Sequence, residues 1–392
     1  MSERGREDGM NEMKRLLGIG WGLVVSVGAV ELPLVTEEMK RFVDEGFVSG
    51  VVSLVGDGEE VLHESAVGLA KREGEEAMTV DKMFWIASMT KPVTGVAVMM
   101  LVEEGKVALE DPVGRYLPEF KELKTAEGEF REVTILECLT HTAGLAELSL
   151  EERDELSLLS ELTELTVRKP LQFEPGSEWR YSQTGINTAG RVVEVVSGML
   201  FPEFLEKRVF GPLGMQDTTF YPSEEEMGRV VQPYQRTDEG ELVAAGYWLL
   251  GKRPITDGTR MPMANGGLFS TARDYLKFGQ MLLREGEFGG KRLLSAESVK
   301  RFRDIQTGEL VVGFTPGNGW GLGCCVIREP QGVTGTLSPG TFGHGGAYGT
   351  QGWIDPVTGR VQVLMIQYAN IGNGDASDLR RAFHEAVAVS LN

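Results

Sequence analysis

The sequence has few cysteines and few histidines. Its 392 residues include three cysteines, Cys138, Cys324 and Cys325, and four histidines. Three cysteines do not make a disulfide framework, and a bridge between adjacent Cys324 and Cys325 would be strained, so we expect that pair to be buried in a strand. The patterns H-E-x-x-H and C-x-x-C are absent from the sequence, so we expect neither a protein-bound metal nor a cofactor.

Basic residues are also in short supply. The chain has 39 lysines and arginines against 58 aspartates and glutamates, a formal net charge of −19. Nucleic acids and anionic membrane surfaces recruit basic patches, so neither is an expected partner. With 41% hydrophobic and 25% charged residues, the chain has the composition of a globular protein with one large domain or two.

Within residues 13–29, residues 16–29 form an apolar run that is too short and too rich in glycine for a stable membrane span. The run follows Lys14 and Arg15 and ends in small residues, which is the pattern of a signal peptide. We therefore expect residues 1–30 to direct export to the periplasm or the medium. A buried N-terminal strand is the alternative, and the sequence leaves open whether the segment is cleaved or kept as an anchor.

Ser88 is followed by a lysine, Lys91, three residues later, and it is the one serine of the sequence with that spacing. On a helix, residues i and i+3 share a face, so the amine can reach the hydroxyl. A desolvated lysine can serve as the base that activates a serine. The apolar run 96–102, the stop at Gly105 and Pro92 in the first turn predict such a helix.

Elsewhere the pattern predicts short strands at both ends of the chain and helices between them. Strands are expected at 49–55, 61–68, 319–327, 349–355 and 360–368, with the first two forming a hairpin. Helices are expected at 36–45 with Thr36 as N-cap, 133–145 with a glycine stop, 186–200, 201–210, 272–285 and 378–390.

This order predicts an α+β fold in which one antiparallel sheet is built from both ends of the chain. We assign residues 31–113 and 265–392 to the sheet-containing domain. Residues 114–264 form a mainly helical domain.

The G-x-S-x-G pattern of α/β-hydrolases is absent, so other residues must complete a Ser-Lys site. Tyr181 is one candidate, because a tyrosine between two cations can have a lowered pKa and relay protons. A packed aromatic residue is the alternative. The segment His344, Gly345, Gly346 is a second candidate, because small residues let a substrate carbonyl approach backbone N–H groups. A simple turn is the alternative there.

The order Ser88-x-x-Lys91, then Tyr181-Ser182-Gln183, then His344-Gly345-Gly346 resembles the serine β-lactamase and DD-peptidase superfamily. It is most similar to the branch of class C β-lactamases, D-Ala-D-Ala carboxypeptidases and family VIII carboxylesterases. Further segments resemble this branch: 85–91, 139–145, 173–176, 211–215 and 266–274. The resemblance covers roughly residues 36–390 and implies the β-lactamase/transpeptidase-like fold, a central antiparallel sheet flanked by helices plus an all-helical region.

The resemblance also implies roles for single residues. Ser88 would be the acylated nucleophile, Lys91 its base or proton relay, and Tyr181 the acid/base for the leaving group and the deacylating water. The N–H groups of Ser88 and Ala347 would form the oxyanion hole. Four residues would contact substrate: Gln183, His344, Gly345 and Gly346.

Three of these positions depart from the β-lactamase pattern. His344 stands where β-lactamases carry the lysine of Lys-Thr-Gly, and a histidine is mostly neutral at pH 7. Gly345 lacks the threonine hydroxyl, and Gln183 replaces an asparagine. We therefore expect a serine hydrolase of small-molecule carboxylic esters. A β-lactamase, a D-Ala-D-Ala carboxypeptidase or D-aminopeptidase, and a penicillin-recognising binding protein without turnover stay open, as does the oligomeric state.

Overall fold

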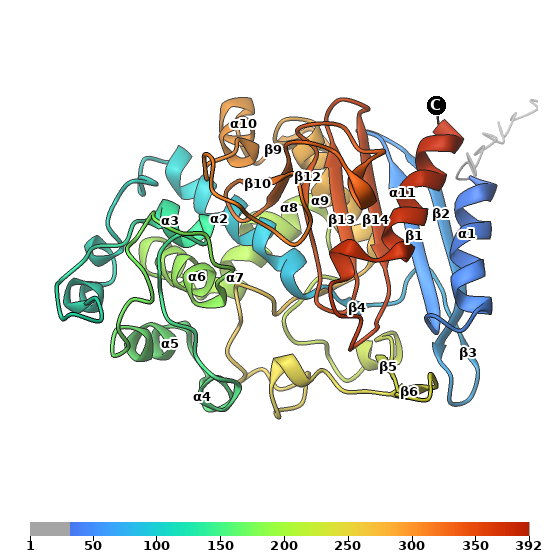
Figure 1. Ribbon diagram of the computed structural model, residues 1–392, viewed down its shortest axis with the longest axis horizontal. Helices are drawn as coiled ribbons and strands as arrows, with labels where there is room; N and C mark the ends of the chain where they lie inside the picture. The colour runs from blue at the N-terminus through green and yellow to red at the C-terminus, as the bar shows by residue number, and fades with distance from the viewer. Residues whose placement is uncertain (1–31, 392) are drawn as a thin grey trace, which may run out of the picture.

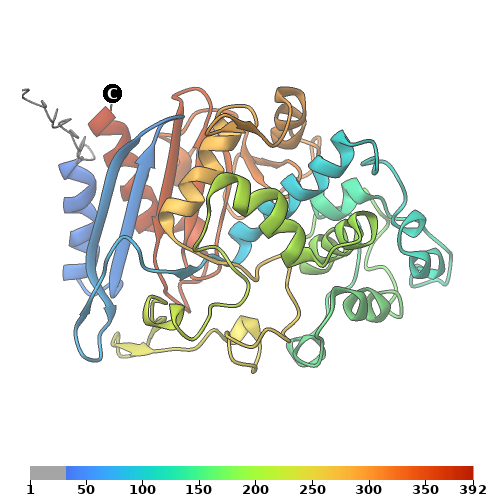
Figure 2. The same cartoon turned by 180° about the vertical axis from the view of Figure 1, so that it is seen from behind.

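The computed structural model describes residues 32–391, so the predicted signal segment lies outside the described residues. A large sheet stands at one end of the molecule, with helices on both of its faces (Figure 1). Helices α1 (Pro33–Asp44) and α11 (Asp378–Leu391) cover one face, and α9 (Ala272–Leu283) covers the other, as the view from behind shows (Figure 2). The mainly helical part of the chain lies beyond the sheet.

The sheet has eight strands, and every neighbouring pair is antiparallel. In spatial order they are β10 (Asn318–Trp320), β11 (Cys325–Ile327), β12 (Phe342–Gly345), β13 (Gln351–Asp355), β14 (Arg360–Met365), β1 (Gly50–Gly56), β2 (Val61–Lys71) and β3 (Glu76–Ala77). The two ends of the chain meet where Val52 of β1 pairs with Met365 of β14. The predicted α+β class and the sheet built from both ends are therefore confirmed.

The first helix begins earlier than predicted. It starts at Pro33, with Leu32 in the N-cap position, and Thr36 lies one turn inside it. Proline suits the first turn because its φ is already helical and its missing N–H would have no partner there. The predicted N-cap role of Thr36 is wrong, and its buried hydroxyl has no hydrogen-bond partner among the described residues.

Residues 319–327 do not form one strand, as the pattern predicts, but a tight hairpin of β10 and β11. The turn between the strands contains Gly323, whose φ of +80° suits glycine. It packs so closely on the helix after Ser88 that a Cβ on Gly95 would collide with the Leu322 carbonyl. Cys324 lies in this turn and Cys325 in β11, and both are buried free thiols.

The other helices are mostly short. They are α2 (Thr90–Glu103), α3 (Ile135–Thr140), α4 (Leu150–Asp154), α5 (Leu159–Thr166), α6 (Gln183–Ser197), α7 (Phe201–Leu205, continued by a π-helical turn, Glu206–Phe210), α8 (Gly211–Leu213) and α10 (Ala296–Arg303). Small strand pairs join β4 (Phe84–Trp85) to β7 (Phe269–Ser270), β5 (Tyr234–Arg236) to β6 (Leu242–Ala244), and β8 (Glu287–Phe288) to β9 (Lys291–Arg292).

Two helix ends correct the sequence prediction near the candidate site. Helix α3 stops at Thr140, because His141 adopts a left-handed conformation with φ of +64°, well before the predicted glycine stop. Helix α6 begins three residues earlier than predicted, at Gln183, where the Ser182 hydroxyl accepts a hydrogen bond from the Gly185 N–H. Both corrections place polar side chains next to Tyr181.

Helix α2 runs through the middle of the molecule. Its residues 90–101 are all buried, and it packs on α6 and α10. The apolar run 96–102 suits a helix in the protein interior, and the predicted helix after Ser88 is confirmed. No helix of residues 32–391 combines the length and apolar character needed to cross a bilayer.

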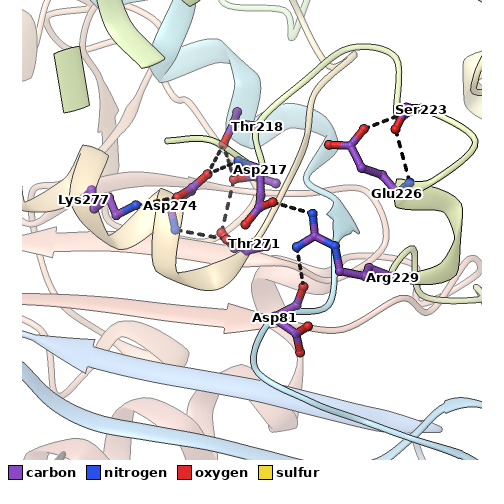
Figure 3. Close-up of polar contacts among 10 residues, drawn as sticks. Asp81, Asp217, Thr218, Ser223, Glu226, Arg229, Thr271, Asp274 and Lys277 are labelled. Carbon is purple, nitrogen blue, oxygen red and sulfur yellow. Dashed lines mark hydrogen bonds and ion pairs between the residues drawn. The ribbon is translucent and has the colours of Figure 1, made fainter. Parts of the chain in front are cut away.

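A network of polar contacts fixes the start of α9 beside the β4–β7 pair (Figure 3). The buried Asp274 carboxylate accepts hydrogen bonds from the Asp217 N–H (2.7 Å) and the Thr218 hydroxyl (3.2 Å). Its other oxygen pairs with Lys277 at 2.8 Å. Thr271 caps the helix, with its hydroxyl accepting from the Asp274 N–H. The network therefore anchors the segment that leads from β7 into α9.

We predict that Asp274→Asn lowers the free energy of unfolding by about 2–3 kcal/mol, because an amide turns one acceptor of a satisfied buried group into a donor. Urea unfolding of the purified protein measures the change. Asp304→Asn is the matched control. Asp304 is 46% exposed and pairs with Lys300 one turn away. Its substitution should therefore change the free energy of unfolding by no more than about 0.5 kcal/mol. Equal effects of the two substitutions would contradict the anchoring role.

Candidate active site

Ser88 lies in a strained turn between β4 and α2. It belongs to a short 3-10 helix (Ala87–Met89). The preceding Ala87 has a φ of +44°, and this backbone conformation is energetically unfavourable for any residue that has a Cβ. The turn is held from one side, because the Trp85 indole N–H donates to the Gly266 carbonyl at 2.7 Å. The Ile86 N–H donates to the Leu268 carbonyl at 3.0 Å. The β7 segment therefore fixes the position of the Ser88 hydroxyl.

Lys91 is buried beneath that hydroxyl. Its Nζ lies 3.0 Å from Ser88 Oγ, 3.0 Å from Gln183 Oε1 and 2.8 Å from the Asn265 carbonyl oxygen. Burial places the pKa of Lys91 well below its ordinary value, and the charge of Glu147 opposes this only in part. Two of the three contacts are to carbonyl oxygens, which only accept hydrogen bonds. A neutral amine that donates to both directs its lone pair to Ser88.

Tyr181 covers this pair. The Lys91 Nζ lies 4.5 Å from the centre of the Tyr181 ring, and the tyrosine hydroxyl lies 3.3 Å from His344 Nε2. Burial raises the pKa of Tyr181, and a contact with the Ser88 hydroxyl offsets this only partly. The predicted lowering of the Tyr181 pKa is therefore wrong, because the removal of water outweighs the contact with the Ser88 hydroxyl. Tyr181 is a neutral phenol that has a proton to give.

His344 is part of β12, a strand that the sequence pattern does not predict. Burial and the nearby Lys91 lower the pKa of His344 to about 3, so the ring is neutral. Its Nδ1 lies 2.6 Å from the Gly345 carbonyl oxygen and must carry the hydrogen. Nε2 is then an acceptor, and the Tyr181 hydroxyl donates to it. His344 thus holds the tyrosine by a neutral hydrogen bond and supplies no positive charge.

These side chains surround one cavity of about 360 Å³. The residues that line it are Ser88, Tyr181, Gln183, Phe314, His344, Gly345, Gly346, Ala347, Gly372, Asn373, Gly374 and Asp375. Apart from Lys91, which lies beneath Ser88, every site residue proposed from the sequence lines the cavity. The structure therefore brings together residues from three distant parts of the chain.

The loop after β12 packs directly against the turn that carries Ser88. A Cβ on Gly346 would lie 2.7 Å from the Ile86 carbonyl oxygen, so this approach requires glycine. The Gly346 N–H bonds to the Thr350 carbonyl, which leaves Ala347 at the tip of the loop. Among the described residues, the N–H groups of Ser88 and Ala347 have no hydrogen-bond acceptor. Both line the cavity and are free to bind an oxyanion.

Sequence reasoning missed two residues behind Lys91 and Tyr181. Asn265 provides the carbonyl that binds Lys91, and its side-chain amide donates to Gln183. Glu147 accepts hydrogen bonds at one oxygen from the Ser182 hydroxyl (2.7 Å) and the Gln183 N–H (2.8 Å). A carboxylate at a helix N-terminus is favourable, so Glu147 fixes the start of α6. Asn265 lies directly before segment 266–274, which resembles the class C β-lactamase branch, so its position was a signal. No local sequence pattern marks Glu147.

Three further cavity residues come from loops. Asn373 and Asp375 lie between β14 and α11, in a segment rich in glycine and asparagine that could have been flagged as a functional loop. Phe314 comes from another glycine-rich loop, which carried no recognisable signal. The Asn373 amide donates to the Phe314 carbonyl at 2.7 Å, so the two loops meet at the rim of the cavity. In residues 32–391, no cluster of histidine, cysteine and carboxylate side chains could hold a metal ion.

An antiparallel sheet flanked by helices, with a Ser-Lys pair at its helical side, is the architecture of serine hydrolases of the class C β-lactamase type. A model of the beta-lactamase family matches residues 35–387, and the chain belongs to that family. The resemblance inferred from the motifs is confirmed.

Two relatives and one solved structure illustrate the membership. Protein Rv1367c of Mycobacterium tuberculosis is 33% identical over 364 residues, covering 84% of this chain and 88% of the relative. Esterase EstB of Burkholderia gladioli is 32% identical over 367 residues, covering 86% and 90%. The structure of EstCE1, a hydrolase with promiscuous acyltransferase activity, superposes with a TM-score of 0.78 at 27% identity and covers 91% and 98%.

The neutral state of His344 predicts a pH dependence of stability. In the unfolded chain its pKa is about 6.5, whereas in the folded protein it is about 3. The unfolded state therefore binds the proton first, and the free energy of unfolding falls as the pH drops from about 6.5 toward 3. From pH 7 to pH 5 this one residue should contribute a loss of about 2 kcal/mol.

Urea unfolding of the wild type and of His344→Gln at both pH values isolates that contribution, because the other buried histidines remain in both proteins. The loss between pH 7 and pH 5 should be about 2 kcal/mol smaller in the variant. Identical pH dependence in both proteins would show that folding does not lower the pKa of His344.

Proposed function

We propose that this protein is an esterase that hydrolyses small carboxylic esters through an acyl-enzyme on Ser88. The arrangement around Lys91 carries the proposal, because two carbonyl acceptors leave the amine lone pair facing the Ser88 hydroxyl. A serine attacks an ester carbonyl only when a base removes its proton. A buried amine with a lowered pKa is such a base at neutral pH.

In the acylation step, Lys91 takes the hydroxyl proton while Ser88 Oγ bonds to the carbonyl carbon of the ester. The carbonyl oxygen becomes an oxyanion, which the N–H groups of Ser88 and Ala347 bind. These groups are backbone donors on fixed turns, so they need no reorganisation when the charge develops. The negative charge also lies close to the newly protonated Lys91.

Collapse of this intermediate breaks the bond to the leaving alkoxide, which takes the phenol proton of Tyr181. Protonated Lys91, 4.5 Å from the tyrosine ring, stabilises the tyrosinate and returns a proton to it. The alcohol departs, and Ser88 carries the acyl group. Attack by water reverses the order: the water gives a proton to Tyr181 while the phenol passes its own proton to Lys91, and Ser88 Oγ then leaves with that proton from Lys91.

Substrate preference follows from the charges around the cavity. β-Lactams and the C-terminus of a D-Ala-D-Ala peptide carry a carboxylate. Among the described residues that line the cavity, none is a lysine or arginine, and His344 is neutral. An uncharged ester needs no such cation. The 32% identity to a protein named Esterase EstB supports the same choice. β-Lactam and D-peptide hydrolysis remain the alternatives within this mechanism.

A side-by-side assay tests the function. We expect kcat/KM for a short p-nitrophenyl ester to exceed the values for nitrocefin and for a D-Ala-D-Ala peptide. Higher efficiency with either of the latter would contradict the esterase assignment. Labelling by a fluorescent penicillin without turnover of any substrate would favour a penicillin-recognising binding protein. Ser88→Ala should abolish ester turnover, and Ser177→Ala, on the exposed loop before Tyr181, should not.

Removal of the Tyr181 hydroxyl tests its part in proton transfer. We predict that Tyr181→Phe lowers kcat for the ester by about 10²–10⁴-fold, the range for loss of a general acid/base. Tyr221→Phe is the matched control, because the Tyr221 hydroxyl donates to the Arg260 carbonyl away from the cavity. Steady-state rates of both variants decide the matter. A rate for Tyr181→Phe close to that of the control would remove the phenol from the scheme.

The charge of Glu147 predicts a shift in the pH profile. Glu147 raises the pKa of Lys91, and the base form of Lys91 is the active one. Glu147→Gln keeps an oxygen to accept the bonds at the start of α6 but removes the charge. The pKa of Lys91 then falls further, and the acidic limb of the kcat/KM profile should move to lower pH.

Glu226→Gln is the control for that profile. Glu226 accepts a hydrogen bond from the Ser223 N–H at another helix start, as Figure 3 shows, so its profile should match the wild type. An unchanged acidic limb in Glu147→Gln, or a shift to higher pH, would show that Lys91 does not set that limb.

A further inference from the structure

Asp375 occupies the space in which a side chain on residue 345 would otherwise lie. A Cβ on Gly345 would collide with the Asp375 carboxylate oxygen Oδ1. The same oxygen accepts a hydrogen bond from the Gln351 amide at 3.0 Å. The carboxylate is therefore built into the wall of the cavity beside β12, and the absence of a side chain at Gly345 makes room for it.

This carboxylate also sets the charge of the cavity. Of the described residues that line the cavity, Asp375 alone bears a formal charge at neutral pH, since His344 and Tyr181 are neutral. Arg380 lies behind it, with Nη1 3.9 Å from Oδ1, and is fully buried. Arg380 thus supports the carboxylate from the interior, whereas Asp375 faces the space that a substrate would enter.

An aromatic ring lines the same cavity. Phe314 lines the cavity, is 39% exposed and packs edge-on against Tyr181, with ring centres 4.8 Å apart. An aromatic ring and a carboxylate in the wall of one cavity suit an ammonium group, because both attract positive charge. The same pair repels an anionic group of equal size.

We propose that Asp375 determines the charge specificity of the cavity, favouring esters that carry an ammonium group over uncharged esters and rejecting those that carry a carboxylate. The inference rests on the proposed function and names the substrate class of that same site. It requires no new chemical step, because Asp375 acts on the binding of the substrate and leaves the ester bond to Ser88. The charge preference should appear in KM more than in kcat.

Two series of substrates of nearly equal size test the proposal. The first varies the acyl group of a p-nitrophenyl ester: 5,5-dimethylhexanoate, hemiglutarate and 4-(trimethylammonio)butyrate. The second varies a meta substituent on phenyl acetate: tert-butyl, carboxylate and trimethylammonium. In at least one series we expect kcat/KM to fall from cationic to neutral to anionic, with steps on the order of tenfold for a charge a few ångströms away.

Asp375→Asn should compress that order, because asparagine keeps an acceptor for Gln351 and loses the charge. Its largest gain should be with the anionic ester, and its largest loss with the cationic ester. Asp378→Asn is the control, because Asp378 lies at the exposed start of α11 and pairs with Arg381. It should leave the order unchanged.

The outcomes separate the two proposals. Turnover of the neutral ester with no charge order in either series overturns the role of Asp375 and leaves the esterase function standing. If a folded Asp375→Asn protein keeps the same order of kcat/KM over the three charges, the role of Asp375 is overturned as well. Failure of every ester overturns the esterase function and, with it, the charge specificity. If the variant does not fold, the order measured with the wild type alone decides.

Discussion

Lys91 is held away from water, and the protonation states of the active-site residues follow from this burial. A lysine in water keeps its proton at neutral pH and cannot take one from a serine. Burial lowers the pKa of Lys91, and the carbonyls of Gln183 and Asn265 then fix the direction of its lone pair. Helix α2, whose residues 90–101 are all buried, holds this basic side chain in the interior.

Burial has consequences for the neighbours of Lys91 as well. The same dry environment raises the pKa of Tyr181 and lowers that of His344, so both rings are neutral. His344, in the segment His344-Gly345-Gly346, therefore supplies a hydrogen-bond acceptor at the position where the β-lactamase pattern has a lysine cation. With no cation in the described lining, the charge of the cavity is left to Asp375, which is present because Gly345 has no side chain.

Much of this could be predicted from the sequence, because much of it is local. The Ser88–Lys91 spacing, the apolar run after it and the hairpin at the N-terminal end depend on neighbours in the chain, and the structure confirms them. Burial is not local, so the direction of the Tyr181 pKa was predicted wrongly. Residues 319–327 read as one strand, although Gly321 and Gly323 were a signal for a turn. The approach of Asp375 to Gly345 depends on a loop whose path no periodicity reveals.

If a neutral Lys91 activates Ser88, the rate at which a fluorophosphonate modifies the protein must follow the deprotonation of Lys91 as the pH is raised. Such a reagent needs no knowledge of the substrate, and peptide mass mapping locates the adduct. We expect an adduct on Ser88, with a modification rate that reaches its plateau well below pH 10.4, where an ordinary lysine loses its proton. A rate that still rises through about pH 10, or an adduct on another residue, would contradict it.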